Sequence, residues 1–222
     1  MFGFSKRLIE PEMLEHAEPA DARVNLRELV VLNKRFGGHS TIRKLFREAA
    51  LTHESFTLLD VGAASGDSGQ LIGELCPHAQ VTNFDCSALN LTNAPYPKVV
   101  GDAFMMPFAP GAFDYVFCSL FLHHFTDGAI ADLLRQFGSI ARRGVLVCDL
   151  ERNVLPYLFM ALSQPVFRWH RITVHDGKKS FRAALSAPEL LRLAQAAGLP
   201  NPSVRVNRPA FRLTLVAKTS ND

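Results

Sequence analysis

The order of strand-like and helix-like segments constrains the fold of this chain most. Short strand-like segments at residues 57–60, 80–84, 113–120 and 144–150, most of them apolar, alternate with amphipathic segments such as 129–141. A continuous apolar run is typical of a parallel strand that is covered on both faces, and alternation of strands with helices is typical of βαβ units. The pattern therefore predicts an α/β fold with a doubly wound, mostly parallel sheet.

Four segments depart from this alternation. Residues 21–50 show helical spacing with a break at a glycine pair, which predicts two helices ahead of the sheet. Residues 151–185 contain two prolines and many aromatic residues, and they interrupt the pattern. A helix is expected over 187–197 behind a serine cap, and 203–218 is typical of an antiparallel hairpin at the sheet edge.

Composition excludes several classes of protein. The 222 residues are 48% hydrophobic and 20% charged, as in an ordinary globular chain. A net charge of +3 is too small to indicate a nucleic-acid partner.

The four cysteines, Cys76, Cys86, Cys118 and Cys148, form no CxxC pair and are predicted to be small core residues in a reducing compartment. Without a long apolar run or a signal-like start, we expect a cytoplasmic protein with no stable membrane insertion; the oligomeric state is not predicted.

Polar residues stand at the ends of the predicted parallel strands. They are Asp60, Asp85, Asp102, Ser119 and Asp149. Ligands of open parallel sheets bind beyond the carboxyl ends of the strands, so we expect these residues to surround one ligand.

The turn after the first strand is rich in small residues. Gly62, Ala64 and Gly66 allow the backbone to approach a ligand closely and leave helix amides pointing at it. The dinucleotide fingerprint needs a small residue at position 67, which is Asp67. This acid would repel a pyrophosphate but could accept hydrogen bonds from an ammonium group. The turn therefore predicts a ligand site that is not of the dinucleotide type.

Taken in order, these segments resemble the class I S-adenosylmethionine-dependent methyltransferases. The run LLDVGAASGD looks like the first motif of that family, with Ala64 where glycine is usual, and GDAFMMPF and FDYVFCSLFLHHF are similar to its later motifs. The resemblance covers residues 55–218. It implies a Rossmann-like methyltransferase fold with seven strands and a C-terminal antiparallel edge hairpin. It also implies S-adenosyl-L-methionine as the cofactor, with S-adenosyl-L-homocysteine as its product.

The resemblance also implies which residues bind the cofactor. Asp85 would hold the ribose hydroxyls, and Asp102 would meet the adenine amino group beside Ala103. Asp60 would order the loop through backbone amides more than it touches the ligand. The full expected set is Asp60, Gly62, Ala63, Ala64, Gly66, Asp67, Asp85, Cys86, Asp102, Ala103, Phe104, Ser119, Leu120 and His124.

The resemblance implies a single domain, 1–222, with 1–50 as a helical N-terminal lid and 151–185 as an insertion that builds the substrate pocket. Within the insertion, the apolar run 154–169 could form core cover or a pocket wall. A turn at Gly177 is expected to gather polar side chains, either as bridging Asp–Arg pairs or as substrate ligands. The substrate candidates are Asp149, Arg152, His175, Asp176 and Arg182.

Two histidines are candidate general bases. His124 belongs to a histidine pair after the fourth strand, and His175 stands beside Asp176; for each, a hydrogen-bonded structural histidine is the alternative. No set of hard oxygen ligands indicates a metal, so none is expected.

The missing (N/D)-P-P-(Y/F) segment disfavours methylation of nucleic-acid bases. Together with the apolar insertion, this favours O-methylation of a small, aromatic or apolar hydroxylated metabolite. C- or N-methylation of a quinone or amine remains an alternative, and so does a non-catalytic sensor that binds S-adenosylmethionine.

Overall fold

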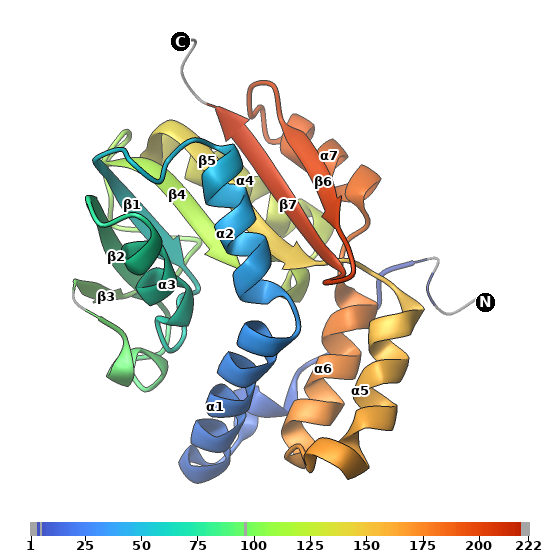
Figure 1. Ribbon diagram of the computed structural model, residues 1–222. Helices are drawn as coiled ribbons and strands as arrows, with labels where there is room; N and C mark the ends of the chain where they lie inside the picture. Colours follow the sequence, from blue (N-terminus) through green and yellow to red (C-terminus); the bar gives the residue numbers. More distant parts are fainter. Residues whose placement is uncertain (1–3, 5, 96, 219–222) are drawn as a thin grey trace.

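The computed structural model describes residues 4, 6–95 and 97–218 (Figure 1). Within these residues seven strands form one sheet in the order β3-β2-β1-β4-β5-β7-β6. The strands are β1 (Phe56–Val61), β2 (Ala79–Asp85), β3 (Lys98–Val100), β4 (Phe113–Ser119), β5 (Ala141–Leu150), β6 (Ser203–Asn207) and β7 (Arg212–Lys218). β1 to β5 pair in parallel, whereas β7 runs antiparallel to both β5 and β6. The predicted Rossmann-like fold with its edge hairpin is confirmed.

Helices cover both faces of the sheet. α2 (Gly38–Glu48) and α3 (Asp67–Leu75) lie on one face, and α4 (Asp127–Ile140) and α7 (Ala187–Ala196) lie on the other (Figure 1). Each pair of helices closes one apolar core against the strands. The strand residues Leu59, Val116 and Phe117 are fully buried, which explains why these strands lack polar alternation.

Three more helices stand beyond the carboxyl ends of the parallel strands (Figure 1). They are α1 (Pro19–Arg35), α5 (Val154–Phe167) and α6 (Arg171–Ala183). The short helices η2 (Met13–His16), η3 (Asn90–Asn93) and η4 (Leu122–His124) complete the elements of the described chain. α1 and η2 come from the predicted lid, whose residues 1–3 and 5 lie outside the described part, and α5 and α6 come from the predicted insertion.

α5 runs through both prolines of the segment that was expected to break the strand–helix pattern. Pro156 lies in the first turn, where no intrahelical bond needs its missing N–H, and Pro165 lies in the last turn. The side chain of Asn153 accepts a hydrogen bond from the Leu155 N–H and caps the helix. No helix within the described residues is both long and apolar enough to cross a membrane.

The turn predicted at Gly177 is wrong, because α6 continues through this residue. A Cβ atom at Gly177 would lie 2.8 Å from Cε of Met160 on α5. The glycine therefore allows α5 and α6 to pack closely, and it does not break the helix.

Three of the four cysteines are buried as predicted, namely Cys76, Cys118 and Cys148. Cys86 is exposed, because it follows the last residue of β2 at the open edge of the sheet. The prediction that it is a core residue is wrong.

Candidate functional site

A cavity of about 1630 Å³ opens between the carboxyl ends of the strands and helices α1, α5 and α6. It has a polar half at the sheet and an apolar half at the helices. Of the fourteen expected cofactor-binding residues, all except Gly66 line its wall. Gly66 lies behind the wall, where a Cβ atom would be 2.7 Å from the Cβ of Ala94.

Backbone geometry shapes the turn after β1. Gly62 has a φ of +71°, and a Cβ atom there would collide with the ring of Phe121. Asp85 accepts a hydrogen bond of 2.9 Å from the Ala64 N–H through Oδ2 and one of 2.9 Å from the Ser87 N–H through Oδ1. Asp85 thus orders the loop, a role that was expected of Asp60.

Asp60 is buried, and its Oδ2 atom has no hydrogen-bond partner among the described residues. Burial raises the pKa of Asp60 to about 8, the charges of Asp85 and Asp67 add to this shift, and the Gly69 N–H opposes it. A cationic donor in the cavity would satisfy this oxygen and restore the ionised form.

Two other acids of the polar half have local partners. Asp67 Oδ2 lies 2.7 Å from His39 Nε2, which ties the start of α3 to α2. Asp102 Oδ1 accepts a hydrogen bond of 2.9 Å from the Phe104 N–H at the exposed rim of the cavity.

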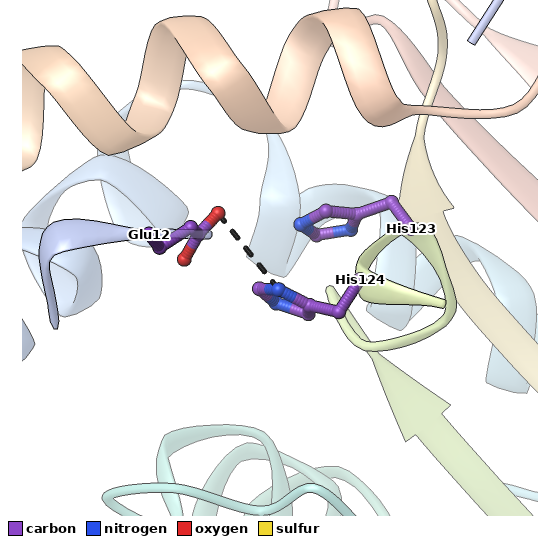
Figure 2. Close-up of side chains that lie close together, drawn as sticks. All are labelled: Glu12, His123 and His124. Atoms are coloured by element: carbon purple, nitrogen blue, oxygen red, sulfur yellow. Dashed lines mark ion pairs between the residues drawn. The ribbon is translucent and has the colours of Figure 1, made fainter. Parts of the chain in front are cut away.

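A histidine pair stands where the two halves meet (Figure 2). His123 Nδ1 lies 2.6 Å from Asp149 Oδ1, while Asp149 Oδ2 accepts hydrogen bonds from the N–H groups of Leu122 and His123. Because a carboxylate only accepts, His123 donates through Nδ1 and keeps a lone pair on Nε2. Asp149 was expected to face the cleft, but it is 1% exposed beneath His123 and lies outside the cavity wall.

His124 lies against the ring of His123, with ring centroids 4.3 Å apart (Figure 2). Its Nδ1 atom is 3.8 Å from Oε1 of Glu12, which the segment before α1 brings to the cavity. Partial desolvation and the charge of His123 lower the pKa of His124, whose side chain is 35% exposed. Burial also acts to lower the pKa of His123, but the charge and hydrogen bond of Asp149 outweigh it, so the pKa of His123 is raised.

Glu12, His123 and His124 each offer a donor atom, all within 4.8 Å of one another, as in a metal centre. The two imidazole rings, however, lie face to face in a tilted pair with only 31° between their planes. Because nitrogen lone pairs lie in the ring planes, such rings direct them side by side and not at one ion. The arrangement fits proton transfer better than metal binding.

Besides Asp149, three further expected substrate ligands lie away from the cavity wall. The side chain of Arg152 is enclosed by both oxygens of Glu189 and by the carbonyls of Phe4 and Ala184. His175 is exposed, and Arg182 also stands outside the wall. Residues on a continuous α6 point in different directions, so the turn that was expected to gather them does not exist.

Asp176 is the substrate candidate that does reach the cavity. Its two carboxylate oxygens accept hydrogen bonds of 2.9 Å from the N–H groups of Met13 and Leu14, and Oδ1 also lies 2.8 Å from His175 Nδ1. Asp176 therefore anchors η2 and pairs with His175, whereas the bridging Asp–Arg pair of this segment is formed by Arg171 with Asp21, 4.0 Å apart.

The apolar half of the cavity includes part of the run 154–169, for which a pocket wall was one of two expectations, together with residues of α1 and α6 that were not named as site residues. It is formed by side chains of α1, α5 and α6 together with residues before α2, such as Leu26, Leu29, Phe36, Phe159, Met160 and Phe181. The helical spacing of 21–50 could have identified the α1 face. No local signal marks Glu12, which reaches the site through a contact distant in sequence.

Part of the chain matches a known family. Residues 59–148 match the family model described as a methyltransferase domain. No curated protein sequence matches the chain.

Several solved structures share the fold. Human N-acetylserotonin methyltransferase in complex with SAM is 16% identical, with a TM-score of 0.66, over 90% of this chain and 57% of that one. A SAM-dependent methyltransferase from Aquifex aeolicus is 14% identical, with a TM-score of 0.62, over 92% of this chain and 100% of that one. An O-methyltransferase family 2 protein from Planctomyces limnophilus, in complex with apigenin, is 16% identical, with a TM-score of 0.63, over 92% of this chain and 63% of that one. The chain thus spans less than two thirds of the human and planctomycete proteins.

The residues present fit S-adenosylmethionine, the cofactor of this methyltransferase fold. The unpartnered Asp60 oxygen suits its ammonium group, and the backbone of the Gly62 turn leaves room for close approach. Asp85 and Asp102 line the same wall and are candidates for the ribose and the adenine.

Proposed function

We propose that this class I S-adenosylmethionine-dependent methyltransferase methylates a hydroxyl oxygen of a small apolar or aromatic molecule. Bound S-adenosylmethionine supplies an electrophilic methyl group on a sulfonium sulfur. The protein then needs to align a hydroxyl with that methyl group and to accept the hydroxyl proton. The observation that carries the proposal is the 2.6 Å contact of His123 with the buried Asp149, which places a carboxylate-backed imidazole where the polar half of the cavity meets its mainly apolar half.

His123 is the proposed general base. Asp149 holds its Nδ1–H, so Nε2 is the atom that accepts the proton, and the buried carboxylate stabilises the imidazolium that results. The lowered pKa of His124 makes that imidazole a weaker base, and we assign it the positioning of the hydroxyl. This assignment moves the base from His124 to its neighbour and leaves out His175, which lies outside the cavity wall.

The dimensions and lining of the cavity support an apolar acceptor. Its volume of about 1630 Å³ exceeds the roughly 300–1,000 Å³ of ordinary ligand sites, so it has room for the cofactor and an acceptor together. The acceptor would lie against the apolar helix side. The apigenin in the planctomycete structure is an aromatic ligand held by a similar fold.

The two segments beyond the sheet have proposed roles in a single domain. Residues 1–50, which include η2 and α1, would act as the lid, and residues 151–185, which include α5 and α6, would form the acceptor pocket. The anchoring of η2 by Asp176 supports this assignment, because it holds the lid against the pocket helices.

A methyl-transfer screen tests the proposal. The protein is incubated with S-adenosylmethionine carrying a labelled methyl group and with matched phenols, quinols and amines of equal size. We expect labelled ethers from phenols or quinols and none from amines. Labelled amines or ring-methylated quinones would establish the N- or C-methylation alternative, and cofactor binding without turnover on the whole panel would establish the sensor.

A further inference from the structure

Helix α5 presents an apolar surface that the proposed reaction does not use. Its fourteen residues include no charged side chain. At about 100° per residue, the outward residues fall within an arc of about 160°. The outward face, as we define it, consists of Val154, Leu155, Leu158, Phe159, Ala161, Leu162, Pro165 and Val166, all exposed.

The outward face is held rigidly in place. On the opposite side of α5, Pro156, Met160 and Ser163 are buried. The ring of Phe159 packs 4.9 Å from that of Phe36 at the end of α1. Leu162 and Val166 nevertheless remain 73% and 75% exposed, so they cannot turn into the core without unfolding the helix.

Cations border the outward face. Lys34 and Arg35 are exposed beside Phe36, and Arg168 and Arg171 are exposed just after α5. Asp21 lies 4.0 Å from Arg171 and offsets part of this charge. An apolar helix face with a basic border is the pattern of helices that lie in the interface of a lipid bilayer.

We propose that α5 docks this protein on the surface of an anionic lipid bilayer. The outward face would lie among the acyl chains, and the four bordering cations would lie among anionic head groups. A helix of fourteen residues is about 21 Å long, too short to span the bilayer, so it would lie along the surface.

A second copy of this chain is the competing occupant, and two observations disfavour it. A strip about 21 Å long and about 10 Å wide offers roughly 200 Å², far below the roughly 800 Å² per partner of a stable interface. In a two-fold pair with parallel α5 helices, the cations of one copy would also face the cations of the other.

Leu155 and Phe159 belong both to the outward face and to the cavity wall. An apolar molecule would therefore pass from the bilayer to the cavity along a continuous apolar surface. The docking proposal itself does not depend on the methylated atom, because its test measures vesicle binding and not methyl transfer.

The test is co-sedimentation of the full chain with phosphatidylcholine vesicles that contain phosphatidylglycerol. The test variant is Leu158→Gln with Leu162→Gln, and the matched control is Val100→Thr with Met105→Gln, which replaces exposed apolar side chains on the other side of the cavity. We expect the wild type and the control to bind, and the test variant to bind at least tenfold more weakly. Raised salt, or vesicles of phosphatidylcholine alone, should weaken binding of the wild type. Circular dichroism and S-adenosylmethionine affinity verify that each variant is folded.

The only tryptophan gives a local readout, because Trp169 stacks on Phe167 at the end of α5 with centroids 5.1 Å apart. Brominated lipids should quench its fluorescence in the wild type. Two results would overturn the proposal: no vesicle binding by the wild type, or equal binding by the test variant. A wild-type dimer that becomes monomeric in the test variant, without vesicle binding, would assign the outward face to a second copy.

Discussion

The two halves of the cavity are built in different ways. In the sheet half, Asp60, Asp85 and Ser119 stand at the carboxyl ends of their strands, so the order of the chain places them. The helix half joins η2 and α1 to α5 and α6, which lie more than a hundred residues later. The first half is polar and fixed by backbone amides, whereas the second is apolar and fixed by long-range contacts. A fold can therefore retain one cofactor site while the acceptor pocket varies with the helices added to it.

Substitution of the proposed base at the boundary of the halves should have the largest effect. His123→Asn can still donate to Asp149 but cannot accept a proton, so kcat should fall by about 10²–10⁴ while S-adenosylmethionine affinity is unchanged. Steady-state kinetics and calorimetry measure the two quantities. His124→Asn is the control, with an expected loss of about tenfold or less; a larger loss in the control would return the base to His124.

One glycine-to-alanine substitution in each half tests whether the backbone of the sheet half is more rigid than that of the helix half. Gly62→Ala meets both a left-handed φ and the Phe121 ring, and should cost about 2–4 kcal/mol of unfolding free energy. Gly177→Ala meets only the flexible end of Met160 and gains helix propensity, so its effect should stay within about 1 kcal/mol. Urea denaturation measures both. Equal costs would show that the sheet half is no more rigid than the helix half.

Substitution of Asp85 should weaken the binding of S-adenosylmethionine to the sheet half and leave the helix half unchanged. Asp85→Ala removes two backbone hydrogen bonds and a carboxylate from the cavity wall, so S-adenosylmethionine should bind about 10–100-fold more weakly. Calorimetry measures this affinity. Asp85→Asn should fall between the variant and the wild type, and an unchanged affinity for Asp85→Ala would refute the role of this residue.

The raised pKa of Asp60 predicts how the affinity for S-adenosylmethionine depends on pH. Its raised pKa of about 8 leaves the carboxyl protonated in the free protein near neutrality. The stability that this proton contributes is therefore greatest at acid pH and is lost as the pH rises toward 8. Binding of a ligand ammonium favours the ionised carboxylate, so affinity should rise by up to about tenfold per pH unit between about pH 6 and 7.5.

Proton release near pH 7, measured by calorimetry in buffers of different ionisation enthalpy, tests this prediction. Asp60→Asn is the control and should release no proton from this site. A wild-type affinity that does not change with pH would contradict the prediction.

The sheet half could be predicted from the sequence because its signals are local. Asp60, Asp85 and Asp102 each follow an apolar run, and parallel pairing brings such residues to one edge. Asp149 follows the same pattern, yet its carboxylate accepts hydrogen bonds from the His123 ring and from the backbone N–H groups of Leu122, His123 and Leu150. Strand position therefore identifies an edge residue but not the direction of its side chain.

The helix half could not be predicted in the same way. Arg152 donates a hydrogen bond to Glu189, which is 37 residues away in the sequence. The Glu189 side chain also completes the capping box of α7. Gly177 looks like a turn residue until the proximity of Met160 is known. These positions depend on contacts between segments, and one sequence carries no local record of such contacts.

The anchoring of η2 has a consequence for synthesis of the chain. Asp176 holds the Met13 amide across a separation of 163 residues, and Glu12 precedes that amide directly. On a ribosome, Glu12 emerges early, whereas its anchor emerges only after β5 and α5 have been made. The glycine turn and the strands around it can form before then. The histidine cluster gains its carboxylate neighbour only after α6 has emerged, so a nascent chain can hold the glycine turn and its strands before Glu12 reaches the histidines.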